Sequence, residues 1–479
     1  MPQPARRTVA ALARRAAAAL VVVLVAGCAA GGSRRARDWS RPTDAASAVA
    51  ARSYGYGPVR NGSVTYQPDV VLIDGGPGVI RSASADGVVW TLAGDAPGVA
   101  DLAVGKVMYA TSRAVGRVAD LRQTGGDVAV TLAPVGLTDV FRDAHFVDDR
   151  EIGDAEAFLQ EVPELPAASG VPADPKRTLK GATVPIGYRL GSDGQLPPAK
   201  TARTATVTVG DWEVQPYRGG GVLGLKVGRK QNDNLKFFAD FSLKYRSLRV
   251  RSDVRVAGGK VDSNSTFALE GIESVAMDIA AGAANGSADN RKIRVEVPIE
   301  IPLPIPGEPL VYVTSWKFVA STAISGKNST VKAGGEWRLD GPIGVIDGVL
   351  KGPSLSVKRS IIDSITGLSV GASGAVFAAE TKVQFGIGIP AAFAGPYAKV
   401  VFSVGITNGS ALGAPLARCI GATLDGKVGG GFGVSASSEA LDALQKLLPK
   451  KIKFKLEGEK LKPFYHRDQT LPPVYLCGA

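Results

Sequence analysis

The sequence predicts an all-β protein, and three observations carry that prediction. Glycine makes up 59 of the 479 residues, about 12%, where about 7% is usual. Nine Asn-Gly or Asp-Gly pairs, from Asn61-Gly62 to Asp425-Gly426, suit tight hairpin turns, because both central residues of such a turn need a positive φ. Several runs alternate apolar and polar residues with period two, whereas sustained amphipathic helical patterns are almost absent.

Changes in composition divide the chain into five predicted segments. We expect a signal peptide over residues 1–27, a flexible tether over 28–61, and a small β module of five to seven strands over 62–161. A Pro- and Ala-rich linker over 162–202 leads to a large domain over 203–479, predicted to be an antiparallel β-sandwich or an open β-barrel. One C-terminal helix is expected from about Ser438 to Leu448, because Ser438 is a good N-cap and Pro449 stops a helix.

One strand of the large domain changes phase part-way along. Phe241, Leu243 and Tyr245 are apolar at odd positions. The apolar residues then move to even positions: Leu248, Val250, Val254 and Val256. This shift predicts a β-bulge or corner near residues 246–247.

A second segment, residues 295–306, is predicted to be an edge strand. Apolar residues fill its odd positions from Val295 to Ile305, and prolines stand at even positions: Pro298, Pro302, Pro304 and Pro306. Alternate N–H groups of a strand point to the same side, so the four missing donors lie along one edge, which a central strand would not tolerate.

The first 28 residues predict export. Four arginines precede an apolar stretch of about eleven residues, Ala16 to Ala26, and no acidic residue occurs before Asp38. At roughly 1.5 Å per residue, this stretch is too short to cross a hydrocarbon core of about 30 Å, and its layout is that of a secretory signal peptide.

The end of this leader resembles a known signal. Val25-Ala26-Gly27-Cys28 is similar to the lipobox of bacterial lipoproteins, and this resemblance covers only the first 28 residues. It implies cleavage before Cys28 and a lipid on the Cys28 thiol. We therefore expect an exported protein, anchored by lipid to the cell membrane or the outer membrane, facing outside the cytoplasm.

Two further cysteines, Cys419 and Cys477, remain after Cys28. An even remainder in an exported chain predicts a disulfide that pins the C-terminus. The alternative is a pair of buried free thiols.

The net charge is +12, and removal of the leader's four arginines lowers it to about +8. Export excludes intracellular nucleic acid as a partner, so we expect anionic envelope polymers or lipid head groups instead. The candidate surface for them is a run of cations on one strand: Lys244, Arg246, Arg249, Arg251 and Arg255. A solvated strand face is the alternative interpretation of this run.

The sequence offers few residues for catalysis. Its two histidines, His145 and His466, lie far apart without a ligand cluster, so neither a metal nor another cofactor is predicted. Gly367-Leu368-Ser369-Val370-Gly371 matches G-x-S-x-G, but the alternating strand-helix pattern of that hydrolase fold is missing. Residues 148–151, with three carboxylates, fit a solvated turn better than a calcium site.

We therefore predict a lipid-anchored envelope protein with a binding or structural role and no catalytic residues. A carrier of lipids or other apolar ligands is the main alternative, and a secreted hydrolase is the third. The interior of the 203–479 domain distinguishes them: a packed core favours binding, an apolar cavity favours the carrier, and a polar cleft with facing carboxylates favours an enzyme.

Overall fold

A computed structural model of the protein describes fourteen stretches of the chain, and all of them belong to one compact unit. They are residues 51, 54–60, 62–84, 87–152, 160–161, 203–204, 207–209, 211–229, 234–304, 308–368, 371–390, 392–411, 414–436 and 461–473. Several predicted features lie outside these residues: the signal peptide with Cys28, the tether apart from residues 51 and 54–60, the 162–202 linker, the 438–448 helix, Ser369 and Cys477.

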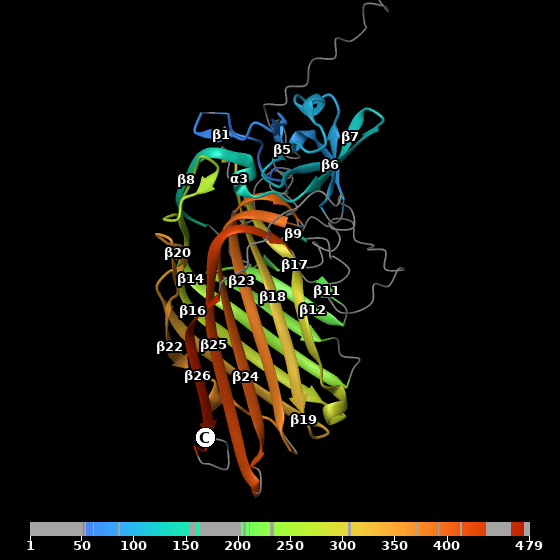
Figure 1. Ribbon diagram of the computed structural model, residues 1–479. Coiled ribbons are helices and arrows are strands. Elements are labelled where there is room, and N and C mark those ends of the chain that lie inside the picture. Colours follow the sequence, from blue (N-terminus) through green and yellow to red (C-terminus); the bar gives the residue numbers. More distant parts are fainter. Residues whose placement is uncertain are drawn as a thin grey trace, which may run out of the picture. The chain divides into compact units, whose positions relative to one another are not determined.

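The prediction of an all-β fold is confirmed (Figure 1). Three sheets of thirteen, seven and six strands contain most of the described residues. Within the described residues, neighbouring strands run antiparallel except for the pair β2 and β5. No helix in the described part of the chain is long and apolar enough to cross a membrane.

Sheet A, the thirteen-stranded sheet, has a main path of seven strands, to which six short or partial strands attach. The path runs through β10 (Arg203–Thr204), β12 (Trp212–Gly219), β13 (Val222–Arg229), β14 (Leu235–Ala257), β16 (Thr266–Ala283), β19 (Ser329–Asp340) and β22 (Ser354–Arg359). The attached strands are β1 (Val64–Tyr66), β8 (Phe141–Glu151), β11 (Val207–Val209), β15 (Lys260–Val261), β20 (Ile343–Ile346) and β21 (Val349–Lys351).

Sheet C, the seven-stranded sheet, is a series of long neighbouring strands. Its order is β26 (Leu461–Leu471), β25 (Ala414–Ala436), β24 (Ala392–Ala411), β23 (Ser373–Ile389), β18 (Val311–Ile324), β17 (Lys292–Pro304) and β9 (Gln160–Glu161). The Pro-rich segment is β17. It pairs with β18 along one edge, and along its other edge it pairs only with the two-residue strand β9. This placement beside the sheet edge agrees with the positions of its prolines.

Sheet B, the six-stranded sheet, belongs to the N-terminal region. Its order is β2 (Val70–Leu72), β5 (Val107–Thr111), β6 (Ala114–Thr124), β7 (Asp127–Ala133), β4 (Val89–Ala93) and β3 (Ile80–Ala83). Short helical turns complete the fold: η1 (Gly76–Val79), η2 (Val99–Asp101), α3 (Leu137–Val140), η3 (Gly286–Asp289) and η4 (Ile362–Ser364).

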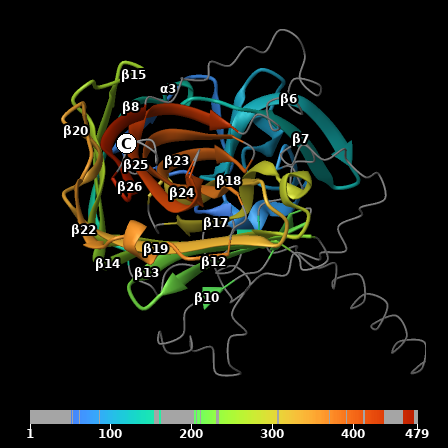
Figure 2. The same ribbon diagram turned by 90° about the horizontal axis from the view of Figure 1, so that it is seen from below.

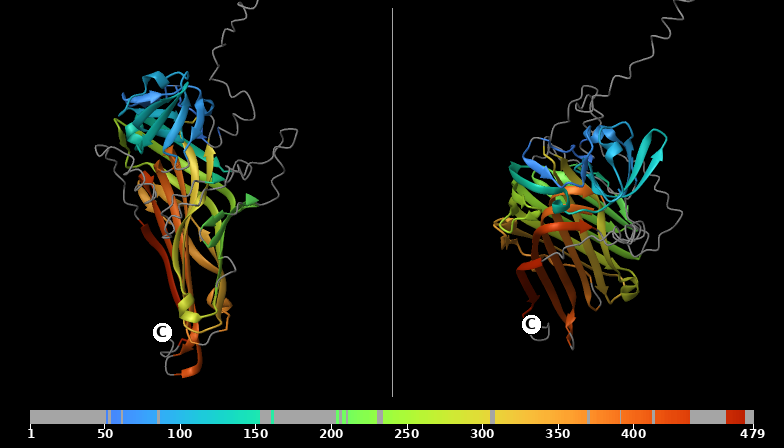
Figure 3. Two further views of the ribbon diagram at one scale, coloured as in Figure 1. Left: turned by 90° about the vertical axis from the view of Figure 1, so that its right-hand side faces the viewer. Right: turned by 45° about the horizontal axis from the view of Figure 1, so that its top comes forward.

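Sheets A and C face each other as two layers, seen from the end in Figure 2 and from the side in the left view of Figure 3. Aromatic rings from both layers meet in the interior. The ring centroids of Phe241 on β14 and Phe402 on β24 lie 6.1 Å apart, and Phe267 on β16 stacks at 6.5 Å on Phe385 of β23. All four side chains are fully buried and belong to one continuous apolar cluster. The space between the layers is therefore filled by side chains at these positions.

The N-terminal region joins the larger part of the chain through a shared sheet. Strand β8 pairs with β14 along eight successive residues of β14, from Arg249 to Val256. The Tyr109 hydroxyl of β5 donates a hydrogen bond to the Pro309 carbonyl, and the Gly388 N–H donates to the Ser112 carbonyl at 3.0 Å. Sheet A therefore contains strands from both regions.

The phase shift predicted for the long strand is confirmed in β14. Odd residues are buried up to Tyr245, and even residues are buried from Leu248 onward. The register with β16 shifts between Tyr245 and Arg249, opposite Gly271. Gly271 has φ +84, and a Cβ there would collide with the Ser247 carbonyl oxygen, so only glycine fits beside the bulge. Along the other edge of β14 the neighbour changes from β13 to β8 at the same place.

Candidate binding surface on sheet A

The five predicted cations all lie on the solvent side of β14. Arg246, Arg249, Arg251 and Arg255 are exposed and Lys244 is half-buried, while the apolar residues between them point inward. The shift near residues 246–247 is what keeps both halves of this run on one side of the sheet.

Carboxylates from neighbouring strands pair with three of these cations. Arg246 lies 3.1 Å from Glu273 on β16. Arg249 forms a two-pronged contact with Asp149 on β8, in which its Nη2 donates to Oδ2 at 2.7 Å. The pKa of Asp149 is lowered by this hydrogen bond. Much of the run is therefore a charge-balanced strand face.

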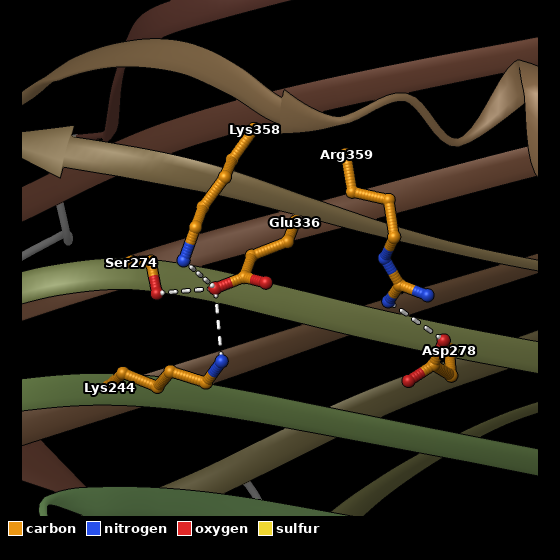
Figure 4. A network of polar contacts seen from close by, with 6 residues as sticks. All are labelled: Lys244, Ser274, Asp278, Glu336, Lys358 and Arg359. Atoms are coloured by element: carbon orange, nitrogen blue, oxygen red, sulfur yellow. Dashed lines mark hydrogen bonds and ion pairs between the residues drawn. The ribbon is translucent and has the colours of Figure 1, made fainter.

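The third pair, Lys244 with Glu336, is part of a larger network (Figure 4). Glu336 Oε1 lies 3.0 Å from the Lys244 ammonium, 2.9 Å from the Lys358 ammonium and 3.1 Å from the Ser274 hydroxyl. These partners come from β14, β22 and β16, so one carboxylate on β19 links four strands. The hydrogen bonds from the two ammonium groups lower the pKa of Glu336 to about 2.

We expect Glu336→Gln to lower the free energy of unfolding at pH 7 by about 1 to 2 kcal/mol, because a charged hydrogen-bond acceptor is lost from a mostly buried position. A lowered carboxyl pKa stabilises the fold above the unfolded value of about 4.5, and this contribution disappears as the pH falls towards about 2. Urea unfolding should therefore show a gap between wild type and variant that is full at pH 7 and narrows at pH 3.

Glu273→Gln is the matched control, since it breaks an ion pair whose arginine is 86% exposed. It should cost less than about 0.5 kcal/mol at either pH. Equal stability of Glu336→Gln and wild type at pH 7 would show that the network contributes nothing.

Arg251 and Arg255, the remaining two cations, line a pocket of about 410 Å³. The outer faces of β8 and β14 contribute Asp149 and Asp253 to it, and the loop after β15 contributes Asp262. Neither arginine forms an ion pair within the described part of the chain. The two members of the predicted run without an ion pair therefore lie together in this pocket.

The opposite wall of the pocket is a hairpin turn far away in the sequence. Asp347-Gly348 joins β20 to β21, with φ +49 and +74, as a type I′ turn requires. A Cβ on Gly348 would collide with the Ser263 carbonyl oxygen, so the turn packs directly on the loop that carries Asp262. The Asp347 N–H donates to the Thr266 hydroxyl at 3.0 Å, which fixes the turn against β16.

Three of the five carboxylates in the pocket lining have partners of their own. Asp149 binds Arg249, and Asp253 Oδ1 lies 2.8 Å from His145 Nε2. Asp148 lies 2.9 Å from Arg150 and accepts a hydrogen bond of 2.8 Å from the Tyr312 hydroxyl. What remains is two arginines, Arg251 and Arg255, beside Asp262, Asp347 and the second oxygen of Asp253. The pocket is polar and open, and charges of both signs line it.

The residues considered for catalysis are not assembled in the described structure. His466 lies on β26 with Nδ1 2.7 Å from Asp425 and Nε2 2.9 Å from Asp468, so both ring nitrogens face carboxylates. The bond to Asp425 raises the pKa of His466. Asp148 and Asp149 point to opposite sides of β8, and the described residues contain no group of three or more His, Cys, Asp or Glu that could hold a metal.

Sequence reasoning missed Asp262 and Asp347 as site residues. The Asp347-Gly348 pair predicts a tight hairpin turn, but it does not indicate that Asp347 lies in a pocket. Asp262 carried no signal, because nothing local to the sequence places it beside Arg255 or the β20–β21 turn.

Two family models match the chain, and together they cover most of its length. A family model described as a domain of unknown function, DUF8402, matches residues 193–460, more than half of the chain. The chain belongs to this family. A second domain of unknown function, DUF8403, matches residues 50–143. No curated protein and no solved structure is significantly similar to the chain. The pocket residues Arg251, Arg255, Asp262 and Asp347 all fall within the DUF8402 match.

Proposed function

We propose that this protein is an exported, lipid-anchored component of the cell envelope that binds a polar envelope ligand in the pocket at Arg251 and Arg255. The observation that carries the binding site is the pocket itself, which is lined by Arg251 and Arg255, the two cations of the predicted run that form no ion pair within the described residues. Anionic groups of envelope polymers or of lipid head groups are the partners that such cations favour.

The proposed anchor is a lipid on Cys28. The support is the leader, with its four arginines, its short apolar stretch and the sequence Val25-Ala26-Gly27-Cys28. An anchored protein stays at the membrane surface, where polymer or head-group ligands are concentrated.

Binding is better supported than lipid carriage. A carrier needs space for acyl chains between its apolar layers, and in sheets A and C aromatic rings meet across the interior, as Phe241 does with Phe402. Binding is also better supported than hydrolysis. Asp148 and Asp149 of the pocket already pair with Arg150 and Arg249, and His466 lies on β26, outside the pocket lining.

We also propose a disulfide between Cys419 and Cys477. Strand β26 pairs with β25 so that Leu471 lies opposite Ile420, the residue next to Cys419. Cys477 lies six positions after Leu471, and a chain of that length reaches up to about 20 Å, which is ample for a return to β25.

Binding to a soluble polyuronate tests the proposed site. We expect Arg251→Ser/Arg255→Ser to weaken this binding about tenfold or more, because both cations are exposed and available for ligand. Binding of the wild type should also fall as salt rises, since such contacts are screened over about 8 Å at physiological ionic strength.

Lys236→Ser/Arg246→Ser is the control, because it removes the same charge from the solvent face of β14 outside the pocket. Thermal melting should show both double variants folded. Salt-insensitive binding, or equal effects of the two double variants, would remove the pocket from the proposal and leave only general attraction to a basic protein.

A further inference from the structure

Charged groups of both signs line the pocket. Arg251 and Arg255 belong to its β14 face, Asp262 to the loop after β15, and Asp347 to the β20–β21 turn. Within the described residues none of these four takes part in an ion pair. Of the other carboxylates of the lining, Asp149 pairs with Arg249, Asp148 contacts Arg150 and Tyr312, and Asp253 contacts His145 through one oxygen. Two cations, Arg251 and Arg255, therefore share a hollow of about 410 Å³ with Asp262 and Asp347, and with Asp253 between the two arginines on β14.

Local hydrogen bonds hold each of the two carboxylates by one oxygen. Asp262 Oδ1 accepts the Asn264 N–H at 2.9 Å. Asp347 Oδ1 lies 3.4 Å from the Thr266 hydroxyl. The second oxygen of each carboxylate forms no hydrogen bond within the described part of the chain, so it is available to a donor on a ligand. Each carboxylate is thus held in place through one oxygen and can accept a hydrogen bond from a ligand through the other.

We propose that the pocket selects a zwitterionic ligand, with an anionic group on Arg251 and Arg255 and an ammonium group on Asp262 and Asp347. An ionised donor and an ionised acceptor form stronger hydrogen bonds than neutral groups do. A ligand with both charges therefore forms such bonds with the arginines and with the carboxylates, and binds more tightly than a ligand with one charge. A purely anionic ligand would gain at the arginines but meet repulsion from the carboxylates. This inference rests on the proposed function, because it takes the same pocket as the binding site.

An aliphatic side chain supplies a further element of the site. Val147, on β8 directly opposite Asp253, lines the pocket and is 61% exposed. An exposed valine in a hollow lined by charges suits the short hydrocarbon spacer that joins the two charged groups of a small zwitterion. Phosphoethanolamine has this chemistry: an ammonium, two methylene groups and a phosphate.

Calorimetry on the full-length lipidated protein in a non-ionic detergent tests the selection with three probes: O-phosphoethanolamine, inorganic phosphate and ethanolamine. We expect phosphoethanolamine to bind at least about tenfold more tightly than either single-charge probe, a difference of about 1.4 kcal/mol. Asp347→Asn should reduce phosphoethanolamine binding to the level of phosphate and leave phosphate binding unchanged or stronger. Asparagine has nearly the same shape as aspartate and also tolerates positive φ, so the turn should keep its conformation.

Asp340→Asn is the matched control, since it neutralises an exposed carboxylate at the end of β19 outside the pocket. Phosphate binding as tight as phosphoethanolamine binding, with Asp347→Asn having no effect, would overturn the zwitterion selection while the proposed anion site stands. Failure of all three probes to bind, together with failure of the polyuronate to bind, would overturn both the zwitterion selection and the proposed binding site.

Competition by vesicles of phosphatidylethanolamine, but not of phosphatidylglycerol, would assign the ligand to a lipid head group. Competition by free phosphoethanolamine alone would assign it to a soluble or polymer-borne group.

Discussion

Replacing Cys28 with alanine should move the protein from the membrane fraction to the soluble extracytoplasmic fraction. The expected effect is nearly complete, because lipid on the Cys28 thiol is the only anchor that the sequence predicts. Fractionation of cells that express wild type or Cys28→Ala, followed by immunoblotting, measures it. Labelling with an alkyne fatty acid should mark the wild type and leave Cys28→Ala unmarked.

The control for this experiment must separate loss of lipid from retention of the leader, since an uncleaved leader can itself hold a chain at the membrane. The mass of the N-terminal peptide distinguishes the two cases. Cys419→Ser/Cys477→Ser should keep both the label and the membrane location, because it changes cysteines away from the leader. A cleaved, unlabelled Cys28→Ala protein that still pellets with membranes would refute the lipoprotein assignment.

Strand β14 shows how much of the fold could be predicted from sequence. Its period-two pattern predicted the buried residues on both sides of the bulge, and the shift at residues 246–247 predicted the bulge itself. Both are local properties, since neighbouring residues of a strand alternate between its two faces. The requirement for Gly271 on β16 was invisible, because it depends on which residue faces the bulge across the sheet.

The candidate site was predicted only in part, for the same physical reason. The five cations of β14 could be read from the sequence and do share one solvent face. The sequence could not show which of these cations form ion pairs, because their carboxylate partners lie on other strands. Asp149 lies on β8 and Glu336 on β19. Without those partners the run looked uniformly basic, whereas in the described structure three of its five cations form ion pairs and Arg251 and Arg255 do not.

The pocket itself is a product of long-range topology. Asp347 lies 96 positions after Arg251 along the chain and reaches the pocket because β20 pairs with β16 next to β14. Sequence pattern gave the turn type at Asp347-Gly348 correctly, since both residues have positive φ. It could not indicate that this turn would close one side of a hollow. A strand register of this kind is set by packing of the whole sheet.

Removing the proposed Cys419–Cys477 bridge should lower the stability of the C-terminal part of the protein by about 2 to 4 kcal/mol, because the bridge would close a loop of nearly 60 residues. Strand β26 lies inside this loop, at the edge of sheet C, and most of its side chains are exposed or half-buried. The strand therefore buries little apolar surface of its own and depends on the β25 ladder and on the tether that a disulfide would supply.

Hydrogen exchange along β26 and urea unfolding should show Cys419→Ser/Cys477→Ser less protected and less stable than wild type. Each single variant should match the double variant, since either one breaks the bridge. Non-reducing peptide mapping of the wild type should recover both cysteines in one linked fragment. Quantitative alkylation of both thiols without a reductant would show that the bridge does not form.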